Sequence, residues 1–315
     1  MRRIILIISI FFSAGTLFAQ QSSLSYYLPF LSQGVDAAIL GSGACKGVYS
    51  PNAFAALENT ARVPFSDAVF ELSASAGLQG VAQSSNTQNL AFGFSSQIKD
   101  NISLSLAYSS EISSPYAIVD ENAMMQGTFQ PGNMILATGL AWRFFPFLSM
   151  GASINYAHQA LAPMHANKSV ALGVSAATVI KDFSVAASLS NLVLINNQSY
   201  TSPASINLDA DYRHVLGQIG LRAMAGASLY VETSALRAGL GLECDWKEMM
   251  YLRVGANSGG ASPMPDFLSV GLGARIRGVR CDIAYIAGNA AYNNSLVLTL
   301  AYRFDKKWKN SKEEQ

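Results

Sequence analysis

Apolar and polar residues alternate strictly near the end of the chain, between Ser295 and Phe304. One face of this run holds the large apolar side chains Leu296, Leu298, Leu300, Tyr302 and Phe304. The other face holds mostly small or polar ones: Ser295, Val297, Thr299, Ala301 and Arg303. A period of two indicates a β-strand with two different faces. Because the same pattern recurs from about residue 68 onward, the chain is predicted to be all-β.

The alternation divides this region into about fourteen segments. They begin near Ala68, Gln88, Asn101, Asn133, Leu148, Lys168, Phe183, Ser205, Gly217, Ala235, Met249, Phe267, Val279 and Asn294. Most are long enough to cross a bilayer at a tilt, for which about 9–11 residues suffice. Single-chain bacterial barrels have an even number of antiparallel strands. The pattern therefore predicts a transmembrane outer-membrane β-barrel of about 14 antiparallel strands.

The connections between these segments alternate between short and long. Tight turns are expected at residues 99–100, 145–147, 181–182, 246–248 and 277–278. Longer stretches rich in Asn, Ser, Gly and Pro lie at residues 111–132, 192–204, 257–266 and 288–293. Outer-membrane barrels have short periplasmic turns and longer external loops. With a periplasmic N-terminus, all the long stretches are predicted to lie outside the cell.

Composition supports a membrane location. The chain is 50% hydrophobic and 13% charged, against roughly 25% charged in an average soluble domain. Its mean hydropathy is +0.23. Beyond the N-terminus no apolar run reaches the length of about 18 residues that a spanning helix needs. A soluble sandwich or propeller fits less well, because charge is scarce everywhere. We expect a protein of the Gram-negative outer membrane, surrounded by outer-membrane lipid.

The N-terminus is predicted to be a secretory signal peptide over residues 1–19. Arg2 and Arg3 are followed by the apolar run 4–12, and Ala19 offers a small residue for cleavage. Residues 20–67 show no sustained alternation and are predicted to fold inside the barrel as a plug. The barrel would span residues 68–304, followed by a charged periplasmic tail at residues 305–315.

Aromatic residues cluster at the ends of the predicted strands. Those at the periplasmic ends are Trp142, Phe144, Phe183, Tyr212, Trp246, Tyr302 and Phe304. Those toward the outer ends are Tyr108, Tyr156, Phe267 and Tyr285. Aromatic girdles mark both membrane interfaces of outer-membrane barrels. All of these side chains are therefore predicted to face lipid.

The inward face changes along the chain. It is mostly Gly and Ser in the first half, which would leave room for the plug. In the second half it carries the predicted lumen charge network: Asp209, Asp211, Arg213, Arg222, Arg237, Glu243, Asp245, Arg253, Arg275, Asp282 and Arg303. One interpretation is a ladder of cross-strand ion pairs that holds the register. The other is a polar track for a solute, without selectivity for one sign of charge because the two signs nearly balance.

Little in the sequence indicates catalysis. His158, His165 and His214 lie at or near strand ends without a cluster at ligand spacing, and His158 and His165 are expected in one external loop. No common nucleophile, zinc-protease or phosphate-loop motif has a suitable context. We therefore expect no enzyme, cofactor or metal. The three cysteines are interpreted as hydrophobes without a disulfide, and the formal net charge of +1 gives no argument for a nucleic-acid partner.

Several runs resemble a known family of outer-membrane proteins. They lie at residues 251–255 (Tyr-Leu-Arg-Val-Gly), 268–273, 281–285 and 298–304, with further matches at 188–192 and 51–56. Together they resemble the PorV/PorQ group, which is related to the FadL-type fatty-acid channels. The group's usual Trp-Asn-Pro-Ala-Gly run is replaced here by Glu-Asn-Thr-Ala-Arg at residues 58–62.

The resemblance implies a fourteen-stranded barrel with an N-terminal segment in the lumen. It implies one of two functions. The preferred one is a non-enzymatic accessory or interaction component linked to type IX secretion, whose partners are secretion-system components or exported cargo proteins. The alternative is a FadL-like passive channel for hydrophobic small molecules. The longest predicted loop, residues 111–132, carries Met124, Met125 and Phe129, which would suit a lid or a partner contact, or simply a loose loop.

Overall fold

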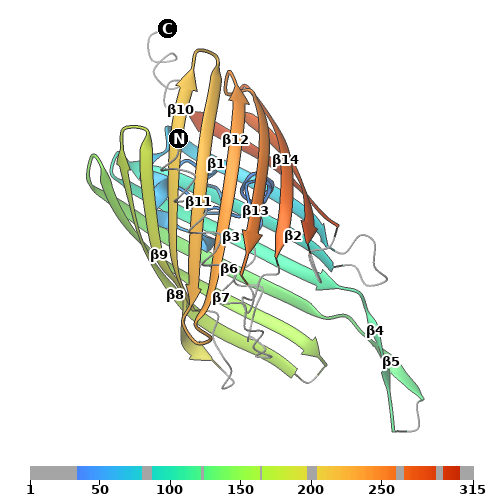
Figure 1. Ribbon diagram of the computed structural model, residues 1–315. Helices are drawn as coiled ribbons and strands as arrows, with labels where there is room; N and C mark the ends of the chain where they lie inside the picture. Colours follow the sequence, from blue (N-terminus) through green and yellow to red (C-terminus); the bar gives the residue numbers. More distant parts are fainter. Residues whose placement is uncertain are drawn as a thin grey trace.

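Fourteen antiparallel strands form a closed barrel in the computed structural model (Figure 1). The structure describes residues 34–79, 87–121, 124–163, 165–196, 204–259, 266–288 and 294–305. The predicted signal peptide, and the tail from residue 306 onward, lie outside the described residues. The fold class expected from the alternation is confirmed.

The strand bounds agree closely with the alternation. The barrel strands are β1 Ala68–Gln79, β2 Thr87–Lys99, β3 Ile102–Ser113, β6 Gly132–Phe145, β7 Leu148–Ala162, β8 His165–Ile180, β9 Phe183–Asn196, β10 Ser205–Leu216, β11 Ile219–Tyr230, β12 Ala235–Trp246, β13 Met250–Ser258, β14 Phe267–Ile276, β15 Val279–Gly288 and β16 Ser295–Asp305. Each pairs with its neighbours in sequence order, and β3 pairs with β6.

The barrel closes because the first and last strands pair. In β1 and β16, Glu71 lies opposite Arg303 and Leu72 lies opposite Tyr302. Closure leaves none of the fourteen described barrel strands with an open edge, whose unpaired N–H and C=O groups lipid could not satisfy.

Along β16 the inward residues Ser295, Val297, Thr299 and Ala301 are buried, whereas the intervening leucines and Tyr302 are exposed. The exposed face of the barrel is thus apolar, as a lipid-facing wall requires. Among the described residues, no helix combines the length and the apolar character needed to cross a membrane.

The barrel has two unlike ends. At the end that carries Asp305, which we call the turn end, β2–β3, β6–β7, β8–β9, β10–β11 and β14–β15 are joined by two-residue turns. The opposite end, the loop end, carries the longer connections. One connection there is shorter than expected, because β7 reaches Ala162 and β8 starts at His165. The prediction that His158 and His165 share a loop is wrong, since both lie within strands.

The stretch between β3 and β6 is not a simple loop. Residues 116–119 and 125–129 form a hairpin of two short strands, β4 (Tyr116–Val119) and β5 (Met125–Phe129), which projects from the loop end in Figure 1. Met124 and Met125 are exposed. Phe129 is partly covered, with its ring 5.8 Å from that of Tyr116. The aromatic cross-strand pair orders a segment that the sequence alone left open.

Most of the predicted girdle residues are exposed on the outer face. Trp142, Phe144, Tyr212, Trp246 and Tyr302 all have exposed side chains, and Phe183 joins them. The ring of Phe304 is partly covered by Phe70, 5.5 Å away between centroids. Phe267 is different: it is buried and packs with Leu40 and Ile286. The prediction that Phe267 faces lipid is wrong, because the first residue of β14 points into the lumen.

The described part of the pre-barrel region, residues 34–66, is here called the inner segment. It contains a short helix α2 (Ala37–Gly41) and two 3-10 turns, η2 (Ala55–Leu57) and η3 (Thr60–Phe65). Most of its residues are buried and none is fully exposed, and in Figure 1 it lies inside the barrel. Its interior position determines what the lumen can do.

Candidate functional site in the barrel lumen

The start of the inner segment is bound to the wall formed by β13, β14 and β16. The Asp36 carboxylate caps α2 by accepting from the N–H of Ala38. The N–H of Ala37 donates to Oγ1 of Thr299 at 2.9 Å. The N–H of Gly43 donates to Oγ of Ser269 at 3.2 Å, and its carbonyl accepts from Nδ2 of Asn257 at 2.8 Å. Wall side chains thus satisfy backbone groups that a buried, irregular segment would otherwise leave without partners.

The end of the inner segment is bound to the other half of the wall. Asn59 caps η3 by accepting from the N–H of Ala61. Oγ1 of Thr60 lies 3.1 Å from Oγ of Ser175 in β8, and Oγ of Ser149 in β7 donates to the carbonyl of Ala61. These contacts involve residues 58–62, where the sequence departs from the Trp-Asn-Pro-Ala-Gly run of the PorV/PorQ group. The departure therefore lies where the inner segment contacts the barrel wall.

Glycines on the inward face provide the space for this contact. A Cβ added to Gly139 or Gly151 would lie within 2.3 Å of Thr60, and one on Gly255 would lie 2.0 Å from the backbone nitrogen of Gly43. The small inward residues noticed in the sequence thus accommodate the inner segment. The same holds in the second, charged half of the barrel.

We predict that Gly255→Ala lowers the free energy of unfolding by about 1–3 kcal/mol, the usual cost of overpacking. The added methyl would meet the backbone of Ser42 and Gly43, which cannot move aside like a flexible side chain. Urea unfolding of the barrel in lipid vesicles measures the effect. Gly132→Ala is the matched control, because its Cβ would have only an ordinary 3.5 Å contact. Equal stabilities of the two variants would contradict the prediction.

Five of the predicted lumen charges form a belt of alternating sign across β10, β11, β12, β13 and β15. Asp211 pairs with Arg222 at 3.0 Å, and Arg222 lies 3.9 Å from Glu243. Arg253 pairs with Glu243 at 2.5 Å and with Asp282 at 2.6 Å. A Cβ on Gly273 would lie 2.2 Å from Asp282 and 2.8 Å from Arg253. The glycine therefore lets Arg253 reach across β14.

Three residues that sequence reasoning missed complete the belt. Arg280 pairs with Asp282 at 2.6 Å, with Asp36 at 2.9 Å and with Glu71 at 3.6 Å. Burial alone would raise the pKa of Asp36, but the charge and hydrogen bonds of Arg280 outweigh it and hold that pKa below its usual value. The alternation could have revealed Arg280, because it lies two positions from Asp282 and therefore on the same inward face.

Four other predicted charges gather at the turn end instead. Arg213 donates to Glu248 at 2.7 Å and lies 3.8 Å from Asp245. Its hydrogen bond holds the pKa of Glu248 below the usual value. Arg303 pairs with Asp305 at 2.5 Å, and Arg275 lies 4.0 Å from the same carboxylate. These pairs are more exposed than the belt, so each contributes about 0–1 kcal/mol.

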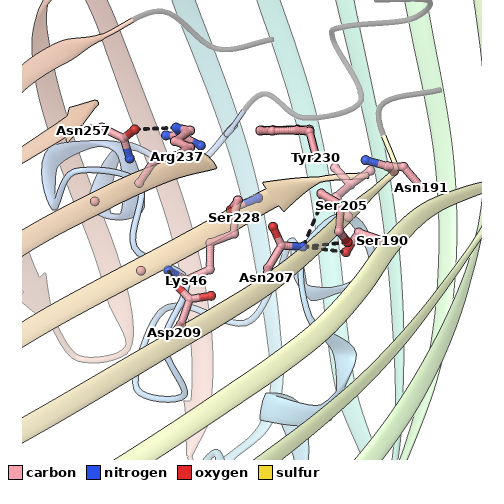
Figure 2. Close-up of a pocket in the computed structure, with 14 residues that line it drawn as sticks. Lys46, Ser190, Asn191, Ser205, Asn207, Asp209, Ser228, Tyr230, Arg237 and Asn257 are labelled. Carbon is pink, nitrogen blue, oxygen red and sulfur yellow. Dashed lines mark hydrogen bonds between the residues drawn. The ribbon is translucent and has the colours of Figure 1, made fainter. Parts of the chain in front are cut away.

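The last two predicted charges, Asp209 and Arg237, line a polar pocket on the inward face (Figure 2). The pocket has a cavity volume of about 30 Å³. Its walls come from β9 to β13 and from the inner segment, whose Lys46 donates its N–H to Oδ1 of Asp209 at 2.8 Å. Nε of Arg237 donates to Oδ1 of Asn257. Asn207 donates to the hydroxyl oxygens of Ser190 and Ser205 at 3.2 Å each, so its side chain links β10 to β9 within the pocket wall.

The fold and the lumen together define a transmembrane β-barrel of the Gram-negative outer membrane, with an apolar exterior, an ion-paired interior and a chain segment inside. No protein-family model matches the sequence, and no curated protein matches it.

Solved structures with the same fold exist. The toluene transporter TbuX of Ralstonia pickettii is 10% identical, with a TM-score of 0.59, covering 88% of this chain and 99% of that one. The toluene transporter TodX of Pseudomonas putida is 10% identical, with a TM-score of 0.58, covering 86% and 98%. At this level of identity, the likeness to the two toluene transporters shows the shared barrel fold alone.

Proposed function

We propose that this protein is a channel that admits hydrophobic small molecules through the outer membrane. The observation that carries the proposal is the likeness to TbuX and TodX over nearly the full length of those transporters. This likeness favours the hydrophobic channel, which the sequence analysis gave as the alternative, over the secretion accessory. The substrate class proposed is small aromatic hydrocarbons, because TbuX and TodX are both toluene transporters.

The occupied lumen supports a channel that is selective rather than open. The inner segment contacts both halves of the wall, through Gly43 on one side and Thr60 on the other. The second cavity, about 20 Å³, lies beside Val35, Leu40 and Ile286 and is partly apolar. A solute that crosses the lumen must therefore pass beside the inner segment or move it.

Uptake of labelled toluene by Gram-negative cells tests the proposal. Cells that carry the barrel in their outer membrane are expected to take up toluene faster than cells with an empty vector. Cells that express an unrelated outer-membrane barrel at equal level are the control for general leakiness. Equal uptake by all three would reject the channel function.

The secretion role remains a prediction from the resemblance to the PorV/PorQ group. The surface that would serve it is the hairpin of β4 and β5, where Val119, Met124 and Met125 are exposed beyond the barrel. A pull-down from native outer membranes distinguishes the two functions. Recovery of secretion-system components would favour this role over the channel.

A further inference from the structure

Two cations line the polar pocket, Lys46 and Arg237, and neither forms an ion pair within the described part of the chain. Arg237 is 5% exposed, and its second terminal nitrogen is buried without a hydrogen-bond partner in the described part of the chain. An arginine side chain that is buried in this way normally pairs each of its donors.

Lys46 lies among charges of both signs. Burial is the main cause that lowers the pKa of Lys46, and the positive charge of Arg237 lowers it further, while Glu58 and Asp209 act in the opposite direction. Asp209 is the one acidic residue among the described lining residues, and one of its oxygens already accepts from the backbone of Lys46. The lining thus holds two positive charges against one negative charge.

The wall of the pocket is also locally irregular. The pairing of β8 with β9 shifts register between Leu172 and Val174. Opposite this shift, Asn191 has a φ of 59° and a buried side chain that lines the pocket. Bulges and left-handed residues other than glycine concentrate at binding sites, where they redirect a side chain.

We propose that this pocket binds an oxyanion, held between the Lys46 ammonium and the free terminal nitrogen of Arg237, with the Ser228 hydroxyl as a neutral donor. A cavity of about 30 Å³ holds two or three water-sized groups, which suits a carboxylate group or the bound oxygens of a phosphate whose remainder lies outside the cavity. The oxyanion is either a free ion or the charged end of an amphipathic compound. The proposal goes beyond the channel function and does not depend on it.

Isothermal titration of the full-length folded barrel in detergent micelles tests the site. Benzoate, inorganic phosphate and toluene are titrated separately; benzoate differs from toluene by a carboxylate in place of the methyl group. Lys46→Met and Arg237→Gln are each expected to weaken benzoate binding about tenfold or more, because charged hydrogen bonds are lost. Lys247→Met and Arg143→Gln, which change turn-end cations outside the pocket, are expected to leave it unchanged.

The outcomes separate the sources of the oxyanion. Binding of both benzoate and phosphate supports a site for free oxyanions, and binding of benzoate alone supports the charged end of an amphipathic compound. No binding of either anion, or equal binding by wild type and the two pocket variants, overturns the proposal. Heat-dependent gel mobility establishes that each variant is folded. A failure of toluene uptake in cells would reject the channel function while leaving this result intact.

Discussion

Arg280→Met is expected to lower the free energy of unfolding by about 3–5 kcal/mol, the cost of removing one partner from a buried ion-pair network. Arg280 is 8% exposed and faces the carboxylates of Asp36, Asp282 and Glu71. Without the guanidinium, these three acids would lie together in a buried site, and their mutual repulsion would add to the cost of burial. Urea unfolding in lipid vesicles, followed by heat-dependent gel mobility, measures the loss.

A matched control distinguishes the effect of losing a buried belt arginine from the effect of losing a more exposed arginine at the turn end. Arg303→Met removes a more exposed arginine, with a side chain 24% exposed and paired with Asp305; this is expected to cost about 1 kcal/mol or less. Adding Asp36→Asn and Glu71→Gln to Arg280→Met should recover part of the stability, because two of the unpaired charges are then gone. Equal losses for Arg280→Met and Arg303→Met would contradict the importance of the belt.

The barrel could be predicted because one physical rule acts on every strand. Lipid lies on one side of the wall and protein on the other, so a side-chain period of two is enforced throughout. β9, β10, β12 and β14 start at the residues expected from the alternation, namely Phe183, Ser205, Ala235 and Phe267. The largest difference is at the loop end, where β8 starts at His165 rather than near Lys168 and continues its pairing with β7.

The lumen could be predicted only in part, because its contacts join residues far apart in sequence. Alternation places Asp211 and Arg222 on the inward face, yet it does not reveal that Arg253 crosses β14 at Gly273 to reach Asp282. Asp36 lies in a region without periodicity, so its pairing with Arg280 had no local signal. Phe267 was misplaced because aromatic character at a strand end suits both the lipid girdle and the contact with α2.

The hairpin of β4 and β5 shows a different limit. Its strands span four and five residues, too short to display a clear period, and they pair with each other rather than with the barrel. Exposed Met124 and Met125 would be consistent with a loop as well as with a hairpin. The pairing of Tyr116 with Phe129 shows that the segment is a hairpin rather than a loop. Such a pairing register cannot be predicted from one short segment alone.

Linking the inner segment to the wall is expected to stop passage of solutes. Oγ1 of Thr60 and Oγ of Ser175 lie 3.1 Å apart, so cysteines at both positions fall within reach of a disulfide. In a background without Cys45, Cys244 and Cys281, the oxidised Thr60→Cys/Ser175→Cys barrel should admit toluene no faster than cells lacking the barrel. This result is expected if solutes pass by displacing the inner segment, because the bond fixes that segment to β8.

Reduction with dithiothreitol should restore uptake, since it frees the inner segment without changing the sequence. The matched control is Thr87→Cys/Ser113→Cys, which links β2 to β3 within the wall, where the two hydroxyl oxygens lie 3.4 Å apart. Its oxidation should leave uptake unchanged. The opposite outcome is that the Thr60–Ser175 disulfide forms and toluene still passes as fast as it does after dithiothreitol treatment. In that case solutes travel beside a stationary inner segment. The selectivity would then reside in the lumen wall rather than in movement of residues 34–66.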